Sequence, residues 1–172
     1  MARRSTKTVT TNVSEVNKTV KENPEITNDT MVICRNGTAG TLIYKSSLNP
    51  GYEVEWNGLG DPQELEYREL VAMRGNQRRF FEENWILIDD KNVIKKLGVD
   101  RYYKNSLTTD DFDDVFSMSP DKIKETVPGL PGGTKDAIIV TAKNKINDGT
   151  LDSRGVIKAL EDSLSVDLEE DI

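Results

Sequence analysis

Residues 31–56, with the sequence MVICRNGTAGTLIYKSSLNPGYEVEW, decide the fold class of this chain. An apolar run at 31–34 is followed by Asn36 and Gly37, a pair that suits a tight turn, and then by a second β-rich run at 41–44. We therefore expect the second run to return on the first as a hairpin. The register of this hairpin stays open, because extra residues separate the turn from the returning run.

A third strand is predicted at residues 52–56, after the turn sequence NPG at 49–51. The segment alternates, so that Glu53 and Glu55 share one face and the apolar residues share the other. Two acidic residues on one strand face are most often simply the face in contact with water. A carboxylate-pair enzyme of the glycosidase type remains the less favoured interpretation.

Helical signals follow this β-rich stretch. Asp61 suits a helix N-cap and Pro62 suits the first helical position, so a helix is predicted to begin there. A second short helix is expected at 77–84 and a buried strand at 85–88. Together these segments predict a small sheet of three or four strands with a helical insertion.

The remainder of the chain is predicted to be helical. A short helix should end at Gly98, and later helices should begin near Ser119, Thr134 and Ser153 (or the preceding Asp152). The apolar faces of these helices are narrow, so the bundle is expected to need the β part or a partner for stability.

The predicted fold class is therefore α+β. An extended, flexible N-terminal arm occupies residues 1–29, and a small antiparallel β domain with a helical insertion occupies 30–90. A C-terminal helical region, predicted to form a bundle with an acidic tail, occupies 91–172.

Composition excludes several classes of function. The 172 residues are 35% hydrophobic and 31% charged, with no histidine and a single cysteine. This rules out a Ser-His-Asp triad, a Cys-His pair, a histidine-ligated zinc site and an internal disulfide. No apolar run approaches the roughly 20 residues that span a bilayer, and no secretory signal is evident at the N-terminus. We expect a soluble protein without a cofactor and without membrane contact.

Charge is unevenly distributed along the chain. The formal net charge is −7, which argues against a general DNA-coating role. The first 21 residues hold five basic residues and one acidic residue, whereas the last twelve hold six acidic residues and no basic one. The two ends would attract each other between neighbouring copies in an assembly, or both are solvated tails.

A thin apolar stripe runs through the N-terminal arm. Its members are Val9, Val13, Val16 and Val20, at spacings of three to four residues. The segment has no aromatic residue and too little apolar surface to order alone. We predict that the valines lie on a neighbouring molecule.

Three further motifs have simple structural interpretations. The glycine-rich loop at 128–135 has Thr and Lys in the wrong order for a phosphate-binding loop, so it is interpreted as a linker and helix cap. The aspartates at 110–114 lack the spacing of a calcium loop, so they are interpreted as a solvated helix start. Cys34 lies in an apolar run and is interpreted as a small buried hydrophobe.

Two clusters combine cations with aromatic rings. Arg78 and Arg79 precede two phenylalanines, and Tyr102 and Tyr103 lie beside basic residues. Such combinations either bind single-stranded nucleic acid by stacking or anchor a protein interface. Because Glu82 and the next residue offset the positive charge, we favour a protein interface and expect no nucleic-acid partner.

This organisation resembles that of small structural proteins of tailed bacteriophages. The resemblance covers most of the chain as a style of composition and layout: a Thr-rich arm, the β stretches MVICRNGTAGTLIYK and GYEVEW, and the tail LDSRGVIKALEDSLSVDLEEDI. It implies a virion component of the head, neck or tail attachment, present in many copies, and it implies no catalytic residue.

We therefore expect a non-enzymatic virion structural protein that is assembled in the host cytoplasm. Its expected partners are copies of itself and other virion proteins. The alternative is a small regulatory or nucleic-acid-contacting module; an acidic DNA mimic and an enzyme are less favoured.

Overall fold

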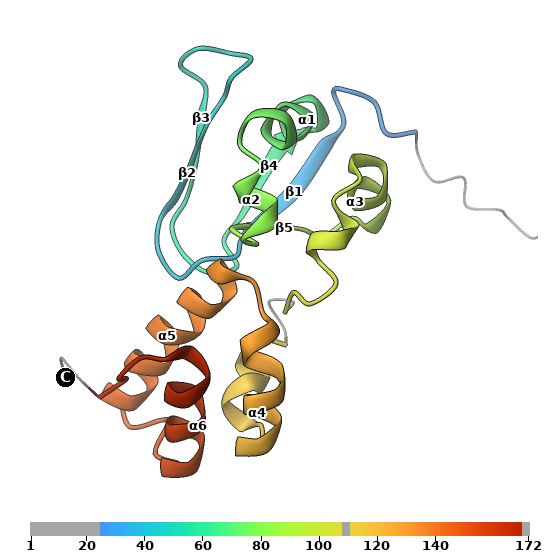
Figure 1. Ribbon diagram of the computed structural model, residues 1–172. Coiled ribbons are helices and arrows are strands. Elements are labelled where there is room, and N and C mark those ends of the chain that lie inside the picture. Colours follow the sequence, from blue (N-terminus) through green and yellow to red (C-terminus); the bar gives the residue numbers. More distant parts are fainter. Residues whose placement is uncertain (1–24, 108–110, 170–172) are drawn as a thin grey trace, which may run out of the picture.

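The computed structural model describes residues 25–107 and 111–169, and it shows an α+β fold with two hydrophobic cores (Figure 1). The strands are β1 (Met31–Asn36), β2 (Leu42–Lys45), β3 (Glu53–Trp56), β4 (Pro62–Glu66) and β5 (Ile86–Ile88). The helices are α1 (Tyr67–Asn76), α2 (Arg79–Glu82), α3 (Lys91–Leu97), α4 (Pro120–Thr126), α5 (Gly132–Asn147) and α6 (Arg154–Leu164). Three short 3-10 helices lie between them: η1 (Asp100–Tyr102), η2 (Asp113–Ser117) and η3 (Val127–Gly129).

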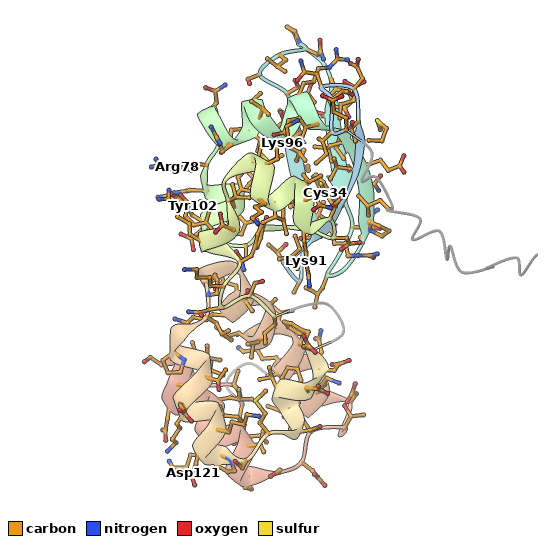
Figure 2. All side chains as sticks on the ribbon, turned by 90° about the vertical axis from the view of Figure 1, so that its right-hand side faces the viewer. Cys34, Arg78, Lys91, Lys96, Tyr102 and Asp121 are labelled. Atoms are coloured by element: carbon orange, nitrogen blue, oxygen red, sulfur yellow. The ribbon has the colours of Figure 1, made fainter. Side chains whose placement is uncertain are left out.

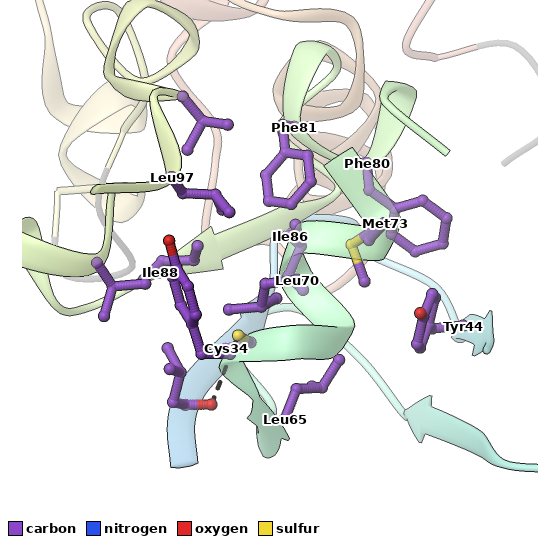
Figure 3. Packing of buried hydrophobic residues seen from close by; sticks show 14 of the residues in the cluster. Cys34, Tyr44, Leu65, Leu70, Met73, Phe80, Phe81, Ile86, Ile88 and Leu97 are labelled. Atoms are coloured by element: carbon purple, nitrogen blue, oxygen red, sulfur yellow. Dashed lines mark hydrogen bonds between the residues drawn. The ribbon is translucent and has the colours of Figure 1, made fainter. Parts of the chain in front are cut away.

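Strand β1 is the centre of an antiparallel sheet with the order β4-β1-β5. Cys34 lies opposite Gln63 on one side and opposite Ile88 on the other. Since side chains alternate across a strand, Val32 and Cys34 point to the same side, and both are buried in the first core. Figure 3 shows Cys34 among Leu70 and other residues of this core, which α1, α2 and α3 also line.

The expected hairpin between residues 31–34 and 41–44 is wrong. Strand β2 pairs with β3, and β1 pairs on its two sides with β4 and β5. The loop after β1 is instead shaped by Asn36, whose side chain accepts hydrogen bonds from the Thr38 backbone and hydroxyl, both at 2.8 Å, and donates to the Gly40 carbonyl at 2.7 Å. The predicted turn at 49–51 is confirmed, because it joins the paired strands β2 and β3.

The predicted helix start at Asp61 and Pro62 is also wrong, because Pro62 begins strand β4. The Asp61 carboxylate accepts a hydrogen bond from the Asn57 backbone at 2.8 Å and thereby closes a turn instead of capping a helix. Proline is tolerated at the first residue of an edge strand, where the missing N–H costs no ladder hydrogen bond. The helix begins five residues later, at Tyr67.

The β2–β3 hairpin extends away from the sheet and is held by α1 (Figure 1). Buried Glu69 of α1 accepts hydrogen bonds from the Tyr44 hydroxyl at 2.8 Å, the Ser46 hydroxyl at 2.7 Å and the Asn49 amide at 3.1 Å. On the inner side of the hairpin, the Trp56 indole donates to the Cys34 carbonyl at 2.9 Å. These bonds fix the hairpin to both α1 and β1.

The second core is formed by α4, α5, α6 and η2. Its helix starts follow local signals in part: Ser119 and Ser153 are N-cap residues, as predicted, whereas α5 begins at Gly132 and not at Thr134. Thr134 is buried in the first turn of that helix. Helix α3, which the predicted division grouped with the helical region, packs on the first core through Val93 and Leu97, and it ends at Gly98 as predicted.

The two cores meet at the N-terminus of α5 (Figures 1 and 2). The Gly133 amide donates to the Glu83 carbonyl at 2.9 Å. A Cβ atom on Gly133 would lie 2.6 Å from Cδ1 of Trp85, so only glycine allows this approach. Ala39 and Leu59, from loops of the β part, also pack against the second core.

Candidate interaction surfaces

The predicted interface residues Arg78 and Tyr102 meet at one carboxylate. Arg78 forms an ion pair with Glu82 at 2.8 Å, one turn later along the chain. The Tyr102 hydroxyl donates to the same Glu82 oxygen at 3.1 Å, although 20 residues separate the two in sequence. The Arg101 guanidinium lies 4.6 Å from the centre of the Tyr102 ring. Helix α2 and η1 thus build a small surface cluster, which we call the α2–η1 cluster.

A shallow hollow of about 370 Å³ adjoins this cluster. Its lining consists of Asn76, Gln77, Arg78, Arg79, Phe80, Glu82 and Trp85. The rings of Phe80 and Phe81 are buried in the first core, so neither ring presents a free face on which a nucleotide base could stack. The cations of the cluster are also partly balanced by Glu82.

The remaining predicted interface residues are placed differently. The Tyr103 hydroxyl points inward and donates to the Ile86 carbonyl at 2.8 Å, and burial raises the pKa of this hydroxyl. Tyr103 therefore anchors η1 to β5. The four valines of the predicted arm lie outside the residues that the structure describes.

A second candidate surface, which the sequence did not reveal, lies on the side of the sheet opposite the helices. Met31 and Ile33 point there from the central strand, with 52% and 44% of their surface exposed. Their cross-strand partners on β4 are Glu66 and Glu64. We call these four residues the outer sheet face. Each exposed apolar side chain on it stands directly beside a carboxylate, and Glu66 also forms an ion pair with Arg68.

The sequence signal for this surface was present but ambiguous. Residues 31–34 are apolar at every position, which is typical of a strand that is covered on both faces. In the structure the helices cover only the face of Val32 and Cys34. The other face is open in the described chain, so the apolar residues there need another explanation.

The candidates for chemistry have structural roles. The Cys34 thiol is buried and lies 3.6 Å from the Val32 carbonyl (Figure 3). Burial raises the pKa of this thiol, and the negative charge of the nearby Asp89 carboxylate raises it further. A thiol in this state stays protonated and is a poor nucleophile. Asp89 itself binds the Arg35 guanidinium through both carboxylate oxygens, at 2.9 and 3.1 Å.

The loop that superficially resembles a phosphate-binding loop is occupied by the protein itself. The Glu83 carbonyl takes the Gly133 amide, and the Lys135 ammonium donates to the Pro128 carbonyl at 2.8 Å. Within residues 25–107 and 111–169, no group of three or more carboxylates or thiolates is arranged to hold a metal ion. Of the helices in the same ranges, none is both long enough and apolar enough to cross a membrane.

Comparison with known proteins gives no relative. No family model, no curated protein and no solved structure matches the chain. The outer sheet face and the α2–η1 cluster are therefore the features that bear on function.

Proposed function

We propose that this chain is a non-enzymatic structural protein of a tailed-phage particle, in the head, the neck or the tail attachment. It acts by binding copies of itself and other virion proteins. The observation that carries this proposal is the outer sheet face, where the central strand exposes Met31 and Ile33.

Physical reasoning supports a protein neighbour at this face. Large apolar residues that are exposed on the open face of a sheet favour a partner that covers them, because their surface is then removed from water. At roughly 25 cal/mol per Å² of buried apolar surface, covering two such side chains favours association. Of the two carboxylates beside them, Glu66 already pairs with Arg68, so Glu64 is the one that favours a partner surface with a positive charge.

The α2–η1 cluster supports the same proposal independently. Arginine and tyrosine are enriched where interfaces concentrate their binding energy. Arg78 and Tyr102 share Glu82 and are therefore held in defined positions, which lowers the entropy cost of binding.

Sedimentation velocity of the purified chain at rising concentration tests this proposal. We expect reversible self-association, and quantitative mass spectrometry of purified particles of the encoding phage should find the chain in many copies. A chain that stays monomeric at every concentration and is missing from the particles would contradict the proposal.

A further inference from the structure

We propose that the outer sheet face of one copy binds residues 1–24 of a second copy. This inference rests on the proposed function, because it names the partner that such an assembly would use. It requires that the N-terminal segment and the outer sheet face match in charge and in apolar pattern.

The charges match. Residues 1–24 contain five basic and two acidic residues, a net charge of +3, which leaves −10 on the rest of a chain whose total is −7. Glu64 on the outer sheet face carries part of this negative charge, whereas the charge of Glu66 is offset by its ion pair with Arg68. A positively charged segment is therefore attracted to the body of another copy, and two bodies alone repel each other.

The apolar patterns match as well. In the outer sheet face, Met31 stands beside Glu66 and Ile33 beside Glu64. In the segment, Val16 and Val20 stand within two residues of Lys18 and Lys21. The valines can cover the exposed apolar side chains while a lysine reaches Glu64, since Glu66 already forms an ion pair with Arg68.

The free edge of the sheet favours the same occupant. Strand β4 is an edge strand that begins with Pro62 and carries Glu64 and Glu66 on its outer face. Proline and like charges on an edge oppose pairing between two identical edges. They do not oppose a basic segment, so the edge discriminates between these two kinds of neighbour.

The described chain begins close to α3. Ile26 packs against the first core, and its carbonyl accepts a hydrogen bond from Lys96 of α3 at 2.5 Å. Figure 2 shows Lys96 on α3, which packs on the helical side of the sheet. Three residues after Ile26, Asp29 forms an ion pair with Arg68, which also pairs with Glu66 of the outer sheet face.

A reciprocal charge reversal in the full-length chain tests the inference. One variant carries Lys18→Glu and Lys21→Glu, and the other carries Glu64→Lys and Glu66→Lys. Each variant alone should associate at least about tenfold more weakly than the wild type, because segment and face then have the same sign. An equimolar mixture should regain association, since each segment then meets a face of opposite sign on the other variant.

The control is a substitution at another exposed apolar residue. Val140 of α5 is 46% exposed, close to the value for Ile33. Val140→Lys should leave sedimentation unchanged, whereas Ile33→Lys should weaken association by at least about tenfold. Raising the salt concentration should weaken wild-type association, because ions screen the charge pairs.

The possible results separate the two proposals. Wild-type association that is insensitive to both charge variants and to Ile33→Lys would overturn this inference and leave the proposed function standing. Charge variants that stay monomeric in the equimolar mixture would also overturn the inference, because segment and face of opposite sign on different copies would then not bind each other.

Discussion

At the scale of single residues, Glu69 is the one carboxylate that is buried within the described residues. Its carboxylate is buried and accepts hydrogen bonds from three side chains of the hairpin, including Tyr44 and Asn49. A buried charge is tolerated only when hydrogen bonds replace its lost hydration. Glu69 thus turns a hairpin that would be marginal alone into a fixed part of the fold.

Replacing this carboxylate should destabilise the protein. In Glu69→Gln, an amide NH2 would face the Asn49 amide or the hydroxyl donors, so we expect the free energy of unfolding to fall by about 1–3 kcal/mol. Urea unfolding measures the loss, and Glu64→Gln on the exposed face of β4 is the matched control. An equal effect of the two substitutions would show that Glu69 does not hold the hairpin.

Stability should fall at alkaline pH. Burial raises the pKa values of the Cys34 thiol and of the Tyr44 and Tyr103 hydroxyls, so the folded state keeps protons that the unfolded chain loses. The stabilisation is fully present below the unfolded pKa values, about 8.5 for cysteine and about 10 for tyrosine, and it decreases as the pH rises above them.

Tyr103→Phe provides the check on this pH dependence. The variant removes one of the three groups, so above about pH 10 its free energy of unfolding should decline less steeply than that of the wild type, by up to about 1.4 kcal/mol per pH unit. Urea unfolding between about pH 8 and pH 11 measures both slopes. Parallel curves would mean that the Tyr103 hydroxyl ionises equally well in both states.

At the scale of elements, β1 combines two different environments in one strand. Val32 is 3% exposed and faces the helices, whereas its neighbour Ile33 is 44% exposed on the outer sheet face. Nothing local distinguishes these two β-branched residues. The difference arises because α1, α2 and α3 all pack on the same side of the sheet.

Matched substitutions should separate the two faces. Val32→Thr places a hydroxyl in the core and should reduce the free energy of unfolding by about 1–3 kcal/mol. Ile33→Thr keeps a β-branched side chain at an exposed position and should change it by about 0.5 kcal/mol or less. Thermal unfolding at low protein concentration, where association is weak, measures both values; similar losses would contradict the assignment of faces.

The elements also show which features of the fold are determined by residues that are neighbours in the sequence. The turn at 49–51, the stop at Gly98 and the cap at Ser153 depend on neighbouring residues, and these predictions are confirmed. The helix predicted at Asp61 failed because strand pairing with β1 outweighed a good local cap signal. Pairing depends on residues that are distant in the sequence, so local patterns cannot decide it.

At the scale of the whole molecule, the two cores are joined where α5 approaches the loop before β5. Gly132 and Gly133 let the helix backbone come against Glu83 and Trp85, and the Gly133 amide forms the hydrogen bond across the junction. The sequence suggested only a linker with a helix cap here. The close approach explains Gly133, because a Cβ there would meet the Glu83 carbonyl oxygen and the Trp85 ring, whereas a Cβ at Gly132 would meet only the flexible Glu83 carboxylate.

Two glycine substitutions should have opposite effects. The new Cβ in Gly133→Ala would push both Trp85 and the Glu83 carbonyl away from the start of α5. We therefore expect a loss of about 1–3 kcal/mol in the free energy of unfolding. Gly75→Ala in α1 meets no atom within 4 Å and should stabilise by about 0.5–1 kcal/mol, through reduced entropy of the unfolded chain. Calorimetry measures both; a stabilising Gly133→Ala would rule out the tight junction.

By itself, the sequence determined the α+β class, the positions of most strands and helices, and the burial of Cys34. These properties follow from periodicity, turn residues and caps, which act over a few neighbouring residues. Only the tertiary structure decided that β1 pairs with β4 and β5, that Glu69 holds the hairpin, and that Met31 and Ile33 remain exposed. The reason is physical: a strand's partners and its covered face are set by competition among segments that are distant in the chain, and that competition is settled only when the whole molecule packs.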